Sequence, residues 1–139
     1  MNEPEAMRAM LAGKTIAVVG LSDSPMKASY GVSRTMQRLG YRILPVNPAV
    51  QEVLGEKAYP SLTELVAAVG KPDIVNVFRL PKFIPAIVDE MIALGLNNLW
   101  VQLGIVNEEA AAKAEQNGIR VVMDRCIMIE EQRLGSRDS

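Results

Sequence analysis

Five stretches of apolar and β-branched residues recur along the chain, and each one ends in polar, glycine or proline residues. They cover residues 15–20, 41–47, 73–78, 98–104 and 120–126. Near-continuous apolar runs of this length are typical of strands that are buried on both faces, as in a parallel sheet. Pro45 has no N–H to donate to a ladder, so we expect the second strand to end there or to lie near an edge of the sheet.

Helical patterns fill most of the segments between these strands. We predict helices in residues 3–12, 29–39, 62–69, 81–94 and 108–116, a loop in 48–60, and a short further segment in 127–134. Ser61 and Glu64 form a capping-box pattern, and Asn107 is placed to cap the alanine-rich helix. We interpret the first helix as a cover over the core, and the paired Glu130 and Glu131 as solvent-facing.

The alternation of strands with helices predicts the fold class. It is typical of a single α/β domain, here residues 1–139, with a Rossmann-like, doubly wound, parallel five-stranded sheet and helices on both faces. Ligands of such sheets bind where the carboxyl ends of the strands meet. The site residues are therefore expected at those ends.

Composition excludes several classes of function. The chain has 139 residues, a net charge of −1, one cysteine and no histidine. The absence of histidine removes His-based nucleophile pairs, proton shuttles and metal sites, and we expect no metal. A near-neutral charge argues against nucleic-acid binding, and the apolar runs are too short to span a membrane. A lone cysteine makes the reducing cytoplasm the simplest location.

The loop after the first strand carries groups that suit phosphate oxygens. Gly20 closes the strand, and Ser22, Lys27 and Ser29 supply hydroxyl groups and a cation before or at the start of a helix. Backbone N–H groups and a helix N-terminus favour an anion at such a loop. We expect a Gly20→Val substitution to block the approach of a pyrophosphate while the fold survives.

The second strand end argues against NAD. An NAD site needs an acidic residue about 20 positions after the glycines to hold the ribose. No Asp or Glu occurs between Asp23 and Glu52, and the strand ends instead at Asn47 and Pro48. An NAD(P)-binding, oxidoreductase-like domain stays the alternative interpretation.

The remaining strand ends complete the candidate site. Arg79 can bind a phosphate, and Phe78 or Leu80 can flank an adenine. Gln102 and Gly104 offer an amide group and bare backbone to a ligand. The last strand ends at Asp124, Arg125 and Cys126, for which we expect an ion pair or tail anchor and a small buried thiol, and we expect Trp100 to pack in the core.

Taken in order, these strand ends resemble the small stand-alone CoA-binding proteins, which are related to the CoA-binding domain of the succinyl-CoA synthetase alpha subunit. The resemblance covers about residues 7–134 and rests on the motifs Gly20-Leu21-Ser22, Pro45-Val46-Asn47-Pro48, Phe78-Arg79-Leu80-Pro81, Trp100-Val101-Gln102-Leu103-Gly104 and Asp124-Arg125-Cys126. It implies a Rossmann-like fold with coenzyme A lying across the carboxyl strand ends.

The resemblance also implies where each part of CoA lies. Gly20 and Ser22 correspond to positions near the pyrophosphate, Asn47-Pro48 to the adenosine, and the stretches around Arg79 and Gln102 to positions nearer the pantetheine arm. Either Lys27 or Arg79 is expected to meet the 3′-phosphate. The synthetases use a phosphorylated histidine from a further domain, which this sequence lacks.

We therefore expect a protein that binds CoA or an acyl-CoA without chemistry of its own, and that works with a partner enzyme or as a homodimer. A second hypothesis is the NAD(P)-binding domain. A third is redox regulation, in which Cys126 forms a mixed disulfide with the thiol of CoA.

Overall fold

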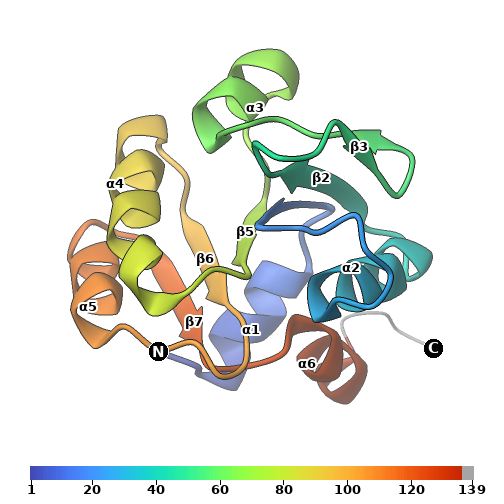
Figure 1. The fold of residues 1–139 in the computed structure, drawn as a ribbon. Helices are drawn as coiled ribbons and strands as arrows, with labels where there is room; N and C mark the ends of the chain where they lie inside the picture. The colour runs from blue at the N-terminus through green and yellow to red at the C-terminus, as the bar shows by residue number, and fades with distance from the viewer. Residues whose placement is uncertain (136–139) are drawn as a thin grey trace.

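The five predicted strands form one parallel sheet in the order β2-β1-β5-β6-β7. We describe residues 1–135 of a computed structural model (Figure 1). The strands are β1 (Thr15–Val19), β2 (Arg42–Val46), β5 (Ile74–Val77), β6 (Asn98–Val101) and β7 (Arg120–Met123). The chain runs outward from β1 to β2 and then returns to β5, so the switch point of this doubly wound sheet lies between β1 and β5. The predicted fold class is confirmed.

Helices cover both faces of the sheet. They are α1 (Pro4–Leu11), α2 (Ala28–Arg38), α3 (Leu62–Val69), α4 (Ile84–Leu94), α5 (Glu108–Gln116) and α6 (Ile127–Leu134). Helices α3, α4 and α5 pack on one face, and α1, α2 and α6 on the other (Figure 1). Side chains cap the N-termini of α3 and α5. The Ser61 side chain accepts a hydrogen bond from the N–H of Glu64, and the Asn107 side chain accepts one from the N–H of Ala110.

The sheet separates two apolar cores. Alternate residues of β1 face opposite sides: Ala17 and Val19 join the core under α3, α4 and α5, whereas Ile16 and Val18 join the other. Trp100 is completely buried in the second core, and its indole N–H donates to the carbonyl oxygen of Arg125. The prediction of a packing role for Trp100 is thereby confirmed.

The edge strand β2 is protected by the segment that follows it. Pro45 continues the strand as far as Val46, and β2 is an edge of the five-stranded sheet, as its proline suggested. Tyr59 then returns to the edge, where its N–H donates to Pro45 and its carbonyl oxygen accepts from Asn47. This contact covers main-chain groups that would otherwise stay open to pairing with another chain.

The segment predicted as a loop holds a small hairpin. Strands β3 (Glu52–Val53) and β4 (Glu56–Lys57) pair around Leu54 and Gly55, which both have positive φ angles. Two positive φ values in sequence are the geometry of the tight hairpin turn that matches strand twist. The loop prediction was therefore incomplete, because strands of two residues leave no periodicity to detect.

Two further predictions need correction. The helix expected over 81–94 is divided into η1 (Pro81–Phe83), a 3₁₀ turn, and α4, because Pro85 lacks the N–H of a continuous α-helix and its ring would clash with the preceding turn. The prediction that Glu130 and Glu131 face solvent was wrong, since both are buried where α6 packs against α1 and α2. The Tyr41 hydroxyl donates to Glu131 at 3.0 Å, and Arg133 donates to Glu130.

Candidate functional site

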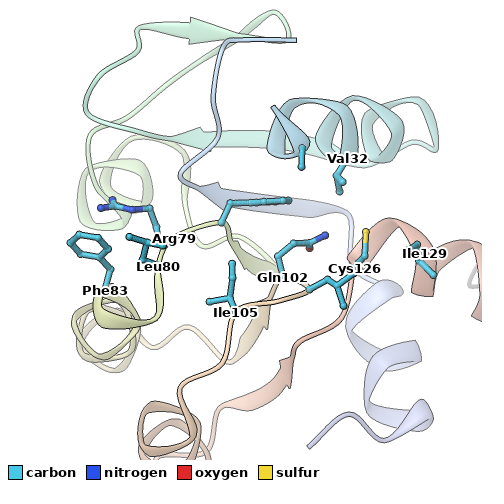
Figure 2. Close-up of a pocket in the computed structure, with 11 residues that line it drawn as sticks. Val32, Arg79, Leu80, Phe83, Gln102, Ile105, Cys126 and Ile129 are labelled. Carbon is cyan, nitrogen blue, oxygen red and sulfur yellow. The ribbon is translucent and has the colours of Figure 1, made fainter. Parts of the chain in front are cut away.

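An apolar cleft of about 610 Å³ opens at the carboxyl ends of β5, β6 and β7, beside the first turns of α2 and α6 (Figure 2). Its floor is made of the buried side chains of Val32, Gln102 and Cys126. Its rim carries large apolar side chains that are unusually exposed, among them Leu80 at 62%, Leu103 at 58% and Ile129 at 47%. A concave, mostly apolar hollow with a few convergent polar groups is the typical form of a small-molecule site.

Gln102 is the polar group at the floor of the cleft. Its side-chain oxygen accepts the N–H of Ile127 and the amide N–H of Asn76, each at 3.3 Å. Asn76 is itself buried in β5, and its side-chain nitrogen also donates to the carbonyl oxygen of Trp100. The end of the Gln102 amide points toward Cys126 (Figure 2). The floor therefore presents an amide NH₂ and a thiol.

Arg79 links the cleft to a second hollow. Its guanidinium carbon lies 4.0 Å from the ring centroid of Phe83, a cation–π contact that holds the side chain over the rim (Figure 2). Both residues line the cleft and also a smaller hollow of about 180 Å³ that includes Pro48 and Pro60. The arginine thus stands between the apolar cleft and the end of β2.

A third hollow, of about 580 Å³, lies beside the end of β2. Asn47, Pro48 and Lys57 line it, and it shares Pro48 and Pro60 with the small hollow that Arg79 reaches. Asn47 is fixed at both ends of its side chain: the nitrogen donates to the Leu21 carbonyl, and the oxygen accepts from Ala49. The three hollows follow one another along the carboxyl edge of the sheet, which is a path suited to a long ligand.

The loop after β1 is held by its own serines. The N–H of Ser22 donates to the hydroxyl oxygen of Ser29, and the N–H of Ser24 donates to that of Ser22, both at 3.0 Å. The loop delivers the chain to the start of α2, whose first turn contains no acidic residue. Ala28, the first residue of that helix, lines the cleft. The positive end of the helix dipole therefore borders the opening.

Gly20 is required by packing as well as by its backbone angle. Its φ is +88°, and a Cβ atom there would lie 2.5 Å from the carbonyl oxygen of Phe78. No side chain fits at that distance without movement of the backbone. Gly20 therefore lets the ends of β1 and β5 come close together, independently of any ligand.

The structure divides the residues predicted for the site into three groups. Those that line the apolar cleft are Phe78, Arg79, Leu80, Gln102 and Cys126. Those that line the hollow beside β2 are Asn47 and Pro48. Those that line neither are Gly20, Ser22, Lys27, Ser29 and Gly104.

The residues of the third group have other surroundings. Ser22 and Ser29 shape the loop, Lys27 is exposed beside α2, and Gly104 donates its N–H to the carboxylate of Asp124 at 2.7 Å. That bond ties the loop after β6 to the end of β7. Within the described chain Asp124 and Arg125 form no ion pair with each other; the Arg125 guanidinium donates to the Asp124 carbonyl oxygen.

Sequence reasoning missed part of the apolar wall of the cleft. Phe78 and Leu80 were predicted for the site, but Val32, Phe83, Leu103, Ile105 and Ile129 were not. The exposed rim residues follow strand ends or a helix start, and that position was the available signal. Within residues 1–135, no group of His, Cys, Asp or Glu side chains is arranged to hold a metal ion, and no helix has the length and hydropathy to span a membrane.

Comparison with known proteins now adds the family. The family model described as "CoA binding domain" matches residues 14–132. The chain belongs to this CoA-binding domain family. An uncharacterized protein of Bacillus subtilis, YneT, is 43% identical over 128 residues and is covered to 93% of its length, with 92% of this chain aligned.

Solved structures and larger enzymes extend the comparison. A structure from Thermus thermophilus has a TM-score of 0.86 and 39% identity, covering 95% of this chain and 98% of that one. A hypothetical protein from Pyrococcus horikoshii has a TM-score of 0.87 and 36% identity, with 95% and 92% covered. The alpha subunit of the ADP-forming acetate–CoA ligase II of Pyrococcus furiosus is 28% identical over 125 residues, which are 82% of this chain and 27% of the subunit. This family member thus spans about a quarter of that ligase subunit.

Proposed function

We propose that this protein binds coenzyme A or an acyl-CoA across the carboxyl edge of the sheet. The observation that carries the proposal is the apolar cleft beside the N-terminus of α2, found in a chain of the CoA-binding domain family. The pantetheine arm occupies the cleft, and the adenosine occupies the hollow beside Asn47 and Pro48. The small hollow between them shares Arg79 and Phe83 with the cleft and Pro48 and Pro60 with the hollow beside Asn47, so it connects the two.

The pyrophosphate lies at the start of α2 in this proposal. The helix has unpaired N–H groups at its N-terminus, as every helix does, and no carboxylate in its first turn opposes an anion. The hydroxyl groups of Ser22 and Ser29 are the adjoining hydrogen-bond donors, because the N–H of Gly20 already donates to the Val46 carbonyl oxygen. A ligand there also screens the charge of Lys27, which directly precedes the helix.

Three cations are candidates for the 3′-phosphate. Arg79 lies between the cleft and the hollows, Lys27 precedes α2, and Lys57 lines the hollow beside Asn47. Lys57 was not considered from the sequence, because the hairpin that carries it was expected to be a loop. We favour Arg79, since its stacking on Phe83 fixes the guanidinium beside both hollows.

We further propose that the protein has no chemistry of its own and works in the cytoplasm with a partner enzyme or as a homodimer. The support is the absence of histidine and the kinship with segments of acetate–CoA ligases. The mixed disulfide between Cys126 and CoA stays a hypothesis. Incubation with CoA disulfide followed by intact-mass measurement tests it, and an unmodified protein beside a reacting control thiol removes it.

Thermal unfolding with CoA, dephospho-CoA and NAD, each in excess, tests the main proposal. A ligand at about 100 times its Kd stabilises the native state by roughly 2.7 kcal/mol, which shifts the midpoint of a domain of this size by several degrees. We expect a shift with CoA and none with NAD. A shift with NAD alone would replace CoA by the dinucleotide alternative. Mass spectrometry of the denatured protein's supernatant first excludes a copurified ligand.

A further inference from the structure

The hydrogen bonds at the floor of the cleft fix which way the Gln102 amide faces. The carbonyl oxygen of Trp100 can only accept, so the Asn76 nitrogen must face it, at 3.1 Å. The same nitrogen and the N–H of Ile127 are both donors to Gln102, so the Gln102 oxygen must face them. The Gln102 NH₂ is left without a bond to any described protein atom; Gln102 is only 6% exposed, and because its nitrogen is not among the fully buried unpartnered atoms, that nitrogen is open to the cleft.

This arrangement selects the chemistry of the group that reaches the floor. Both lone pairs of the Gln102 oxygen are already used by Asn76 and Ile127. The floor therefore offers a strong donor and no free amide oxygen, beside the apolar Val32 and the thiol of Cys126 (Figure 2). A ligand that covers this donor without accepting a hydrogen bond from it binds less tightly, so a matching ligand brings an acceptor there.

Three groups of a CoA ligand differ in this respect. A free thiol is a weak acceptor, and it leaves the Gln102 NH₂ unsatisfied. An amide of the pantetheine arm brings a carbonyl oxygen, but its N–H then needs an acceptor that the Gln102 oxygen cannot supply. A thioester brings a carbonyl oxygen and no N–H. It is the one of the three that matches a lone donor in apolar surroundings.

We infer that the site is built for a thioester, so that the ligand is an acyl-CoA whose carbonyl oxygen accepts a hydrogen bond from the Gln102 NH₂. The inference rests on the proposed function, because it takes the pantetheine arm to lie in the cleft. Asn76 is a positioning residue here, acting only through the orientation of Gln102. Gln102 becomes the residue that distinguishes acyl-CoA from free CoA.

Calorimetric titration with acetyl-CoA, S-ethyl-CoA and CoA tests the inference on the unmodified protein. S-ethyl-CoA keeps the chain length of acetyl-CoA and lacks only the carbonyl oxygen. We expect acetyl-CoA to bind at least about tenfold more tightly than S-ethyl-CoA, the usual effect of leaving one buried donor unsatisfied. Equal affinities for these two ligands would overturn the inference and leave CoA binding intact. No binding of any of the three would overturn the proposed function as well.

Variants of the floor assign the effect to one side chain. Gln102→Glu keeps the acceptor for Asn76 and Ile127 but replaces the NH₂ by an oxygen, so the ratio of the two affinities should fall to about one. Gln102→Met, which has no donor, is the second variant should the buried carboxylate prevent folding. Val32→Ala alters the same floor without touching a hydrogen bond, and we expect it to change all three affinities together. A preference that persists in Gln102→Glu would overturn the assignment.

Discussion

The two ends of the sheet differ in how far the protein itself covers their polar and apolar groups. At the amino end, one carboxylate oxygen of Asp73 accepts from the N–H groups of Lys14 and Thr15 and from the Thr15 hydroxyl. The N–H of Asp73 donates to that hydroxyl oxygen, and its carbonyl oxygen accepts from Asn98. These bonds tie the starts of β1, β5 and β6 together, although the side-chain oxygen of Asn98 is buried without a partner among the described residues.

At the carboxyl end the same strands leave their groups open. The Gln102 NH₂ has no partner in the described chain, and Leu80 and Leu103 expose more than half of their surface. Exposed apolar side chains gathered around a free donor are typical of a surface that binds a ligand. The amino end therefore holds three strands together, whereas the carboxyl end leaves a donor and large apolar side chains open, which is the end where the proposed ligand binds.

The largest expected effect is a loss of stability from a substitution at the carboxyl end of the sheet. Gly20 lies at the carboxyl end, yet Gly20→Ala places a Cβ atom 2.5 Å from the Phe78 carbonyl oxygen at a φ of +88°. We expect a loss of about 3 kcal/mol in the free energy of unfolding, from the clash and the strained backbone together. Urea unfolding measures it. From the sequence alone, the fold is expected to survive a larger residue at position 20; from the structure we now expect such a residue to destabilise the fold.

Gly104→Ala is the matched control for the clash. Its φ is +86°, but nothing lies within 4 Å of a Cβ atom placed there. This variant has the backbone strain alone, and we expect it to lose about 1 kcal/mol. If both variants lose a similar free energy of unfolding, the close contact between residue 20 and the Phe78 carbonyl oxygen does not matter for stability. The end of β1 would then tolerate an added Cβ atom as well as the loop at Gly104 does.

The next effect concerns ligand binding and not stability. Arg79→Ala removes the guanidinium that stacks on Phe83, and we expect CoA affinity to fall about tenfold, as for loss of one charge-assisted hydrogen bond. Dephospho-CoA should lose much less, and the free energy of unfolding should change by less than about 0.5 kcal/mol. Titration calorimetry with both ligands measures the difference. Lys27→Ala and Lys57→Ala are measured in parallel. If Arg79→Ala weakens CoA and dephospho-CoA equally, Arg79 does not contact the 3′-phosphate, and one of the two lysines becomes the candidate.

A smaller effect tests the amino end through pH. The Lys14 N–H, and after it the N–H and hydroxyl of Thr15, hold the pKa of Asp73 below its ordinary value. The folded state therefore favours the carboxylate, and its contribution is complete above the ordinary pKa of about 3.9 and is lost as pH falls through the lower folded pKa. We expect Asp73→Asn to lower the free energy of unfolding by about 1 kcal/mol at neutral pH, since solvent screens this exposed group.

Below about pH 4 the difference between Asp73→Asn and the unmodified protein should shrink, because the native carboxylate becomes protonated. Urea unfolding across pH 2.5–7 follows it, with CoA affinity at neutral pH as the control. If the difference in the free energy of unfolding stays constant over this range, the Asp73 carboxylate does not contribute to the acid sensitivity of the fold. If Asp73→Asn also lowers CoA affinity, the amino end of the sheet influences ligand binding at the carboxyl end, contrary to our expectation.

How far the sequence predicts this molecule depends on how far each feature repeats. The sheet and helices were predicted because buried parallel strands and amphipathic helices extend over several residues. The β3–β4 hairpin was not, since each strand has two residues. Glu130 and Glu131 were expected in solvent because an isolated helix has a polar face. Only the packing of α6 against α1 and α2 encloses them.

The cleft shows the same limit. The positions of Phe78, Arg79 and Gln102 at strand ends were sufficient to predict that they lie at one edge of the sheet. Val32 was not predicted for the site, because an apolar residue on a helix gives no local sign that it borders an opening. The orientation of the Gln102 amide depends on Asn76, 26 positions away in sequence, and on the N–H of Ile127, 25 positions away. Such tertiary hydrogen bonds leave no local pattern.

The smallest expected effect compares two exposed apolar side chains. Leu103 lies on the rim of the cleft with 58% of its surface exposed, and Val69 ends α3 with 40% exposed. Leu103→Ser and Val69→Ser should each change the free energy of unfolding by less than about 0.5 kcal/mol, because neither side chain is in the core. Only Leu103→Ser should weaken CoA binding, by roughly three- to fivefold, since a ligand in the cleft buries part of its surface. If the two variants bind CoA with equal affinity, the exposed rim at Leu103 does not contact the ligand. Ligand binding at the carboxyl end would then depend on the floor of the cleft and not on this part of its rim.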